Sequence, residues 1–373
     1  MKTEVLQQSL NKALSIVGRL ISGRGQLPVL ANVLIEAKKE GLVLSATNLE
    51  MGVRVIGGGK VFEEGAITVP AKSLAELVGS MGEVNVELVT DGEKLKVTGG
   101  KMMATFAGIA ASEFPVMPQI QAGGTKEGRV EIKKKVVEEI AAQVAFAAAV
   151  DESRLVLTGV MIKPEGNDVW VTATDGFRLS RKRLGEGKGL EGWNSTLIFP
   201  ARAVAELARI CSESKKEEVI METVSENNQI IFDCGQVQLI SRILEGNFPD
   251  VEKVVAKSFK TEVVLDKEEL SRAVRAVSIF ARENNNIIKM EIREGAIKFS
   301  AIASQTGEGE TELEAETKGE DGTIAFNYRY IMDFLGSVKT ERVTFKMNDG
   351  LDPGVWGEDG NEDFLHIIMP VRV

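Results

Sequence analysis

Few residues in this 373-residue chain have the chemistry for acid–base, nucleophilic or metal-assisted catalysis. The single histidine, His366, lies in FLHIIMPV, a pattern typical of a strand, and we interpret it as a structural residue. The two cysteines, Cys211 and Cys234, cannot complete an ordinary zinc site with one histidine. They also fit a reducing compartment better than a disulfide framework. We therefore expect no catalytic residues, no metal and no cofactor.

The stretch ATDGFRLSRKRL, residues 173–184, places an Asp-Gly pair before a run of lysines and arginines. Asp175 could be an acid catalyst, a turn residue or part of a binding surface, and the stretch alone leaves all three open. GGTKEG lacks the Gly-x4-Gly-Lys-Ser/Thr spacing of a phosphate-binding loop, and GRGQLP is no dinucleotide fingerprint. The carboxylate pair Glu138–Glu139 lies in a charged helix and is interpreted as solvated. These patterns disfavour an enzyme.

An internal repeat predicts the elements that position these residues. TVPAKSLAELVGSM (68–81) matches IFPARAVAELARIC (198–211), and AFNYRYIMDFLGSV (325–338) is a weaker third copy. LVLSATNLEMGVRV (42–55) and VWVTATDGFRLSRK (169–182) match in the same order. Several elements in matching order indicate duplication. The predicted domains are residues 1–124, 125–255 and 256–373, with linkers at QAGGTKEG (121–128) and VAKSF (255–259).

Each repeat is predicted to hold two helices packed on antiparallel strands, an α+β fold. Apolar residues spaced by three or four, such as Leu6, Leu10 and Leu14, predict the first helix. Between the helices lie runs rich in Val, Ile, Leu and Thr, broken by turn signals such as TDGEK, which predict strands. The expected helices cover 6–24, 70–82, 133–150, 200–211, 267–282 and 327–339.

The charge is unevenly distributed along the chain. The formal net charge of -10 argues against a protein that simply coats nucleic acid. The six expected helices nevertheless hold 15 Lys or Arg against 7 Asp or Glu, which predicts one face that attracts phosphate. Ordinary solvated helix surfaces are the alternative. No DNA-reading motif is visible and aromatic residues are only 5%, which leaves contact with the DNA backbone without sequence readout. No apolar run approaches the length of a membrane helix.

Eight pieces of the sequence, in this order, resemble one family: GRGQLPVLANVLIEA, LSATNLEMGVRV, TVPAKSLAEL, SEFPVMP, ATDGFRL, GNFPDVEKVV, FNYRYIMDFL and MPVRV. Over its whole length the chain resembles the bacterial DNA polymerase III beta subunit, the replicative sliding clamp. The resemblance implies the DNA clamp fold and a head-to-tail ring of two chains around duplex DNA that tethers the replicative polymerase. The size of the domains agrees with a ring of two chains. A domain of about 124 residues is roughly 35 Å across, so a closed ring of six domains leaves a central hole wide enough for a DNA duplex, whereas a ring of three does not.

The resemblance also implies a pocket between the second and third domains, where partners insert a short peptide. The matching positions before the third domain are Leu157, Thr174, Gly176, Phe177, Arg178, Leu179, Pro249, Lys253 and Val254. Those in the third domain are Asn327, Tyr330, Leu351, Ile367, Met369, Pro370, Val371 and Arg372. Aliphatic and Met side chains would form an adaptable floor, with Arg178, Lys253 and Arg372 as a polar rim. Core packing is the alternative for each apolar residue. The terminal IIMPVRV is expected to be docked.

The resemblance also implies candidate residues for DNA binding and for the interface between the two chains of the ring. Arg24 and Arg154 match DNA-binding positions, and Lys72 and Arg202 begin matching helices, where solvated cations are the alternative. For the dimer interface, the helix AVSIFAR offers Ile279 and Phe280. The strand GKMMATF (100–106) offers Met103, Thr105 and Phe106, and its unpaired edge would be a liability in a monomer.

The expected partners are duplex DNA, a second copy of the chain, the DNA polymerase III alpha subunit, the clamp loader, and other polymerases and repair proteins. The expected location is the cytoplasm, at the nucleoid, and a monomeric peptide-binding adaptor of the same fold is the alternative function. The repeat narrows the role of Asp175, because its counterpart ATNLEMGVRV starts with the same Ala-Thr. Asp175 is therefore predicted to form a turn, while Gly176 leaves room for an approaching peptide backbone.

Overall fold

The computed structural model describes residues 1–21, 27–120, 129–185, 190, 193–224, 228–256, 258–305 and 307–372. These residues form two compact units, Met1–Lys135 with Glu206–Ile243, and Val136–Ala205 with Leu244–Val373. The first predicted linker, 121–128, lies outside the described residues, as does Lys257 of the second.

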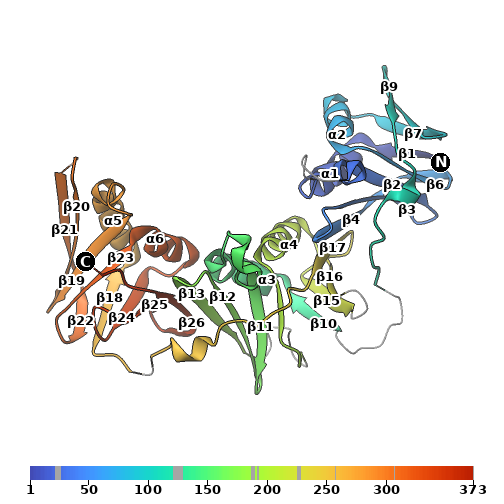
Figure 1. The fold of residues 1–373 in the computed structure, drawn as a ribbon. Coiled ribbons are helices and arrows are strands. Elements are labelled where there is room, and N and C mark those ends of the chain that lie inside the picture. The colour runs from blue at the N-terminus through green and yellow to red at the C-terminus, as the bar shows by residue number, and fades with distance from the viewer. Residues whose placement is uncertain are drawn as a thin grey trace. The chain divides into compact units, whose positions relative to one another are not determined.

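The first unit contains two antiparallel sheets (Figure 1). The five-stranded sheet has the order β5 (Lys60–Glu63), β1 (Lys2–Leu6), β7 (Asn85–Asp91), β8 (Lys94–Gly99) and β9 (Met102–Ala107). The eight-stranded sheet has the order β10 (Arg129–Lys133), β15 (Glu218–Val224), β16 (Gln229–Asp233), β17 (Val237–Arg242), β4 (Met51–Gly58), β3 (Gly41–Thr47), β2 (Asn32–Lys38) and β6 (Gly65–Pro70). Helix α1 (Gln7–Gly18) packs beside α2 (Ala71–Ser80) and against β3 and β4.

The second unit also contains two antiparallel sheets. The nine-stranded sheet has the order β14 (Leu197–Pro200), β11 (Gly159–Glu165), β12 (Asp168–Thr174), β13 (Arg178–Leu184), β26 (Asn361–Ile368), β25 (Gly354–Glu358), β24 (Arg342–Met347), β18 (Thr261–Asp266) and β22 (Glu316–Gly319). The four-stranded sheet has the order β21 (Gly307–Glu314), β20 (Ala296–Ala303), β19 (Ile287–Arg293) and β23 (Gly322–Asn327). Helix α5 (Lys267–Ala281) packs beside α6 (Tyr328–Ser337) and against β20 and β21.

The threefold repeat is visible in the order of elements. Pro70, Pro200 and Asn327, which align in the sequence, each stand immediately before a helix: α2, α4 (Ala201–Glu213) and α6. The other three helices, α1, α3 (Lys134–Gln143) and α5, each follow directly after a short strand, namely β1, β10 and β18. The strand of five or six residues that precedes each of these three helices was not predicted from the sequence.

Two helices are shorter than the apolar spacing predicted. The helix expected over 6–24 ends at Gly18, where the amides of Arg19 and Leu20 bond to carbonyls three residues back, in a tightened last turn. The helix expected over 133–150 ends at Gln143, because Val144 has φ -120° and ψ -53°, outside the helical region. Apolar residues continue beyond the C-terminal ends of both helices, so the spacing of apolar residues predicted helices longer than the hydrogen-bonded ones.

Two strand pairings join different repeats. Strand β17 of the second repeat pairs with β4 of the first, and β26 of the third repeat pairs with β13 of the second. Each pairing makes one continuous hydrogen-bonded sheet from two repeats. The middle third of the chain therefore contributes strands to both compact units, which cut across the predicted repeats.

Candidate functional site

The turn between β12 and β13 is held by the side chains of Thr174 and Asp175. Thr174 Oγ1 donates to the Arg178 carbonyl at 2.6 Å and accepts from Gly176 N at 3.0 Å. Asp175 Oδ1 accepts from the amides of Phe177 and Arg178, both at 2.9 Å. Gly176 has φ 92°, a conformation that L side chains rarely adopt. Asp175 is thus a turn residue, as the repeat predicted.

Arg178 ties this turn to two other elements. Its Nε lies 3.1 Å from Asp175 Oδ2, its Nη1 pairs with Asp333 of α6, and its Nη2 donates to the Phe146 carbonyl at 3.0 Å. The guanidinium carbon lies 4.7 Å from the centre of the Tyr330 ring. The Arg178 side chain is only 11% exposed, so its donors serve the protein itself. Arg178 is therefore part of the frame of the site rather than a free cation on its rim.

The C-terminal segment docks beside the same turn. After β26 ends, Met369 N donates to the Phe177 carbonyl at 2.8 Å, and Val371 N donates to the Ala325 carbonyl at 2.8 Å. These bonds confirm the prediction that the terminal residues are docked as far as Val371. Val373 lies outside the described residues.

An apolar cluster lies between β13, β25, β26 and the segment 246–254. Its buried members are Leu179, Val251, Val355 and Ile367, with Phe248, Val254, Val255, Phe259 and Leu365 packed against them. Sequence comparison proposed only Leu179, Val254 and Ile367. Val251 and Val355 were missed because a valine in a strand or after an acidic turn carries no local signal for a site. The cluster is apolar, which is the character that the resemblance implies for the floor of a peptide site.

Several of the proposed positions carry exposed apolar side chains. Phe177 is 62% exposed, Leu351 60% and Met369 39%, and all three were proposed from the sequence. Leu155, which was missed, is 51% exposed and follows Arg154, whose Nη2 donates to the Asp175 carbonyl at 3.3 Å. Exposed apolar groups of this kind are typical of protein-binding surfaces when they gather in one patch.

The remaining proposed positions differ in environment. Leu157 and Thr174 are buried, whereas Pro249, Lys253 and Arg372 are exposed and Pro370 is half-buried. Lys253 pairs with Asp250 at 3.1 Å. Asn327 caps α6 by accepting from Arg329 N at 3.0 Å. Burial, together with the charge of Asp175, raises the pKa of the Tyr330 hydroxyl. Two of these residues, Leu157 and Asn327, therefore have structural roles of their own.

His366 is fully buried, with its ring against Phe146 and Phe334. Its Nδ1 lies 2.6 Å from Ser180 Oγ, and its ring stacks on Phe334 with centres 5.7 Å apart. Burial, and then the charge of Arg178, lowers the pKa of His366 to about 3. The imidazole is therefore neutral at physiological pH and inaccessible, which agrees with the structural role predicted from the sequence.

The two cysteines are buried and not joined in a disulfide. The hydrogen bond between the thiols, then burial, raises the pKa of Cys234 far above its usual range, which keeps that thiol protonated. Across the described ranges, no cluster of His, Cys, Asp and Glu side chains has the arrangement to hold a metal ion. A search of the helices in the same ranges finds none with the length and apolar character to cross a membrane.

The cations proposed for DNA lie in different settings. Lys72, at the start of α2, is exposed, and Arg202 of α4 has a side chain that is 67% exposed. Arg154 is also exposed, but its guanidinium contacts the turn at Asp175. Arg24 lies outside the described residues.

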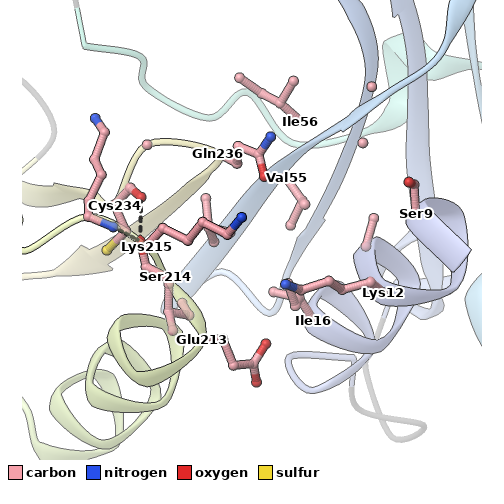
Figure 2. A pocket seen from close by; sticks show the side chains of 17 residues that line it. Ser9, Lys12, Ile16, Val55, Ile56, Glu213, Ser214, Lys215, Cys234 and Gln236 are labelled. Atoms are coloured by element: carbon pink, nitrogen blue, oxygen red, sulfur yellow. Dashed lines mark hydrogen bonds between the residues drawn. The ribbon is translucent and has the colours of Figure 1, made fainter.

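A basic pocket in the first unit was not predicted. It has a volume of about 620 Å³, and its walls come from α1, β4, β17 and the end of α4 (Figure 2). Lys12, Lys215 and Lys216 line it, and none forms an ion pair with another described residue. Figure 2 shows Lys12 and Glu213 on opposite sides, but Glu213 is already paired with Arg19 at 2.5 Å. The pocket is therefore positive, and only the tertiary structure brings these lysines together.

Each of the four sheets ends in strands that have a neighbour on one side only, within the described part of the chain. Two of these edge strands are β9, in the five-stranded sheet, and β21, in the four-stranded sheet. On β9, Met103 is 64% exposed, Thr105 is exposed and Phe106 is half-buried. On α5, Ile279 is 54% exposed, whereas Phe280 packs over Gly309 of β21. Sequence reasoning proposed β9 and α5 but missed β21.

Comparison with known proteins agrees with this geometry. Models of the DNA polymerase III beta subunit match in chain order, with the N-terminal domain over residues 1–118, the central domain over 131–250 and the C-terminal domain over 252–372. A beta sliding clamp from Synechocystis sp. is 30% identical, with 100% of each chain covered. The DNA polymerase III beta subunit of Pseudomonas aeruginosa is 27% identical, with 100% of each chain covered and a TM-score of 0.91. That of Thermotoga maritima is 25% identical, with 100% and 99% covered and a TM-score of 0.89.

The repeated domains, the paired sheets and these matches define a DNA sliding clamp. The chain belongs to the DNA polymerase III beta subunit family, the bacterial beta sliding clamps. Ring dimers and the recruitment of replication proteins are general properties of this family.

Proposed function

We propose that two copies of this chain close head to tail into a ring that encircles duplex DNA and tethers the replicative polymerase. Its membership of the sliding-clamp family over the whole chain carries this proposal. A tether makes rebinding of the polymerase intramolecular, at high effective concentration. The chain acts as an accessory subunit with no catalysis of its own, in the cytoplasm at the nucleoid. Its partners are the polymerase III alpha subunit, the clamp loader, and other polymerases and repair proteins.

The ring is tested by loading the protein onto nicked circular DNA and then linearising the DNA. A topological clamp is retained on the circle and slides off the linear form. Retention after linearisation would instead indicate ordinary binding. The mass in solution is a second test, because a species near the single-chain mass of 40.4 kDa at micromolar concentration would support a monomeric adaptor.

Ring closure is proposed to pair β9 of one copy with β21 of the next. Both strands offer unpaired backbone groups, which favour pairing with another chain. The neighbour of β9, strand β8, carries exposed Lys94 and Lys96, whereas β21 carries exposed Glu310 and Glu312. The two edges are therefore complementary in charge as well as in hydrogen bonding.

Charge reversal tests this pairing. Glu310→Lys with Glu312→Lys is expected to weaken dimerisation at least tenfold, as measured by sedimentation at low salt. Combining those changes with Lys94→Glu and Lys96→Glu is expected to restore most of the loss. If the combined variant is weaker still, the proposed pairing of β9 with β21 is wrong.

The DNA contacts are proposed to be phosphate contacts without base readout. The candidates are Arg24, Lys72, Arg154 and Arg202, together with the pocket lysines Lys12, Lys215 and Lys216. Replacing the three pocket lysines with Gln is expected to lower the salt dependence of DNA binding, because each phosphate contact releases counterions. An unchanged salt slope would remove these lysines from the DNA surface.

The peptide site is proposed to lie on the apolar cluster of Leu179, Val251, Val355 and Ile367, beside the turn of Phe177. The exposed apolar rim and the docked terminus support this placement. Deleting residues 369–373 is expected to abolish binding of peptides from the replicative polymerase and to leave the dimer intact. Unchanged peptide affinity would contradict the site but not the ring.

A further inference from the structure

The basic pocket of the first unit has the dimensions of a small-molecule site. Its volume of about 620 Å³ falls within the range of about 300–1,000 Å³ that such sites have. Helix α1, strands β4 and β17 and the residues around the end of α4 all contribute to its wall (Figure 2). The lining residues all belong to one compact unit, so the pocket lies within a single chain.

Hydrogen bonds fix the end of α4 against the turn between β16 and β17. Ser214 Oγ donates to the Cys234 carbonyl at 3.1 Å and accepts from Lys216 N at 3.1 Å. Gly235, at φ 94°, has the Lys216 side chain directly over it, with Cε 2.8 Å from the place that a Cβ atom would take. The segment that carries Lys215 and Lys216 is therefore held in place by its own contacts.

Two of the pocket lysines extend toward each other. Figure 2 shows Lys12 reaching into the pocket from α1 and Lys215 reaching into it from the segment after α4. Both residues are exposed, so a ligand in the pocket has access to their ammonium groups. Two like charges that face one space repel each other, and an anion bound between them would relieve this repulsion.

The protein itself does not neutralise these charges. Within the described part of the chain, Lys12, Lys215 and Lys216 form no ion pair. The carboxylate among the described lining residues is that of Glu213, which Arg19 already binds at 2.5 Å. The chain has 55 Asp and Glu against 45 Lys and Arg, so these unpaired lysines do not reflect a shortage of acidic residues. The pocket therefore has both the room and the charge for an external anion.

The lysine side chain favours phosphate over carboxylate as that anion. An ammonium group is a point charge that donates to phosphate oxygens without a fixed orientation. The planar fork of a guanidinium is what matches a carboxylate, and no arginine is among the described lining residues. Several ammonium groups in one pocket also favour an anion with several charges, which a diphosphate has and a single carboxylate lacks.

We propose that this pocket binds a diphosphate group between Lys12 and Lys215, with Lys216 adding to the positive potential. The diphosphate is either inorganic or part of a nucleotide. The same lysines are candidates for contacts with DNA phosphates, so a bound diphosphate and DNA would compete for them. The proposal does not rest on the ring or on DNA binding, because diphosphate binding is measured on the full chain alone.

The test compares inorganic diphosphate with citrate, which carries a similar negative charge on carboxylates. Titration calorimetry at low salt, without divalent cations, is expected to show diphosphate binding at least tenfold tighter than citrate. Equal affinities would indicate a general attraction of anions and would overturn the proposal. The absence of saturation by about 1 mM diphosphate would overturn it as well.

The double variant Lys12→Gln with Lys215→Gln is expected to weaken diphosphate binding at least tenfold. Both lysines are exposed, so the variant is expected to fold, which circular dichroism checks. Lys39→Gln with Lys101→Gln is the matched control, because these lysines are also exposed but do not line the pocket. The control removes the same charge and is expected to change the affinity less than about twofold. Equal losses in the two variants would overturn the proposal.

The source of the diphosphate is distinguished by ADP and adenosine. Tighter binding of ADP than of inorganic diphosphate assigns the pocket to a nucleotide, and the reverse order assigns it to inorganic diphosphate. Adenosine binding as tightly as ADP would show that the phosphates are not recognised, against the proposal. A double variant that loses diphosphate but keeps the natural salt dependence of DNA binding would separate this site from the proposed DNA contacts.

Discussion

The turn after β3 in the first unit and the turn after β12 in the second are built by the same hydrogen bonds. In both, a threonine hydroxyl donates to the carbonyl four residues later, at 2.9 Å for Thr47 and 2.6 Å for Thr174. In both, the amide two residues later donates to that hydroxyl at 3.0 Å. Asn48 Oδ1 and Asp175 Oδ1 each accept two further amides. The duplicated sequence therefore repeats the turn bond by bond.

The side chains built on this common frame differ. The position of Gly176 is Leu49 in the first turn, and the position of Arg178 is Met51, which is 9% exposed. Only the second turn has a cation that reaches another helix, through the pair of Arg178 with Asp333. The shared hydrogen bonds therefore do not by themselves create a binding site. The proposed peptide site depends on the side chains that differ between the two turns.

The largest expected effect comes from Arg178→Met, which gives the second turn the residue of the first. It is expected to lower the free energy of unfolding by about 3 kcal/mol, because it removes three charged interactions from a mostly buried group. Denaturant unfolding followed by circular dichroism measures the change. Arg183→Met on the same strand is the control, and because the Arg183 side chain is 42% exposed, its ion pairs are expected to contribute little to stability. Equal losses would contradict the role of Arg178 as part of the frame.

The next largest effect is expected in the pH dependence of the free energy of unfolding, through His366 in the second unit. Ser180 and His366 pair across strands where the first unit has Val53 and Leu239. The pKa of His366 is about 3 in the folded chain and about 6.5 when unfolded, so the unfolded state binds the extra proton between these values. The free energy of unfolding is expected to fall by about 1.4 kcal/mol per pH unit as the pH drops below about 6.5.

The double variant Ser180→Val with His366→Leu tests this linkage by copying the first unit. Unfolding at several pH values between 7 and 5 is expected to show a shallower dependence in the variant, by about 2 kcal/mol at pH 5. Parallel curves for the variant and the natural chain would show that His366 does not carry the dependence.

A smaller effect is expected at the left-handed position of each turn. Gly176→Ala places a side chain at φ 92° and is expected to cost about 1 kcal/mol. The reverse change, Leu49→Gly, relieves φ 74° but adds backbone entropy to the unfolded chain, so little net change is expected. Thermal unfolding of both variants measures the difference, and a larger loss in Leu49→Gly would contradict it.

The smallest effect on stability is expected from Phe177→Glu, which copies Glu50. Phe177 is 62% exposed, so the free energy of unfolding is expected to change by less than about 0.5 kcal/mol. Peptide affinity is expected to fall about tenfold, because an exposed aromatic anchor is lost. Fluorescence anisotropy of a labelled polymerase peptide measures this, with Glu50→Phe as the matched change that should create no second site. Full peptide affinity in Phe177→Glu would remove Phe177 from the site.

The parts of the site that sequence predicted are those with a local signal. Thr174, Asp175 and Gly176 follow turn chemistry, and the exposed Phe177 and Met369 lie in segments that resemble the family. Val251, Val355 and Leu155 were missed, because an isolated valine or leucine looks the same in a core and in a binding floor. The strand β21 was missed because its run of alternating glutamates is typical of an ordinary solvated edge.

The sequence by itself determined the threefold repeat, the family and the type of each turn. The turns depend on hydrogen bonds between residues within four positions of each other, which residue types alone can specify, and the repeat and the family are visible as patterns of residues along the chain. Only the tertiary structure decided that Arg178 meets Asp333, 155 residues away, and Phe146, 32 residues away. The physical reason is that such contacts follow from strand register and packing across repeats, which no local pattern encodes.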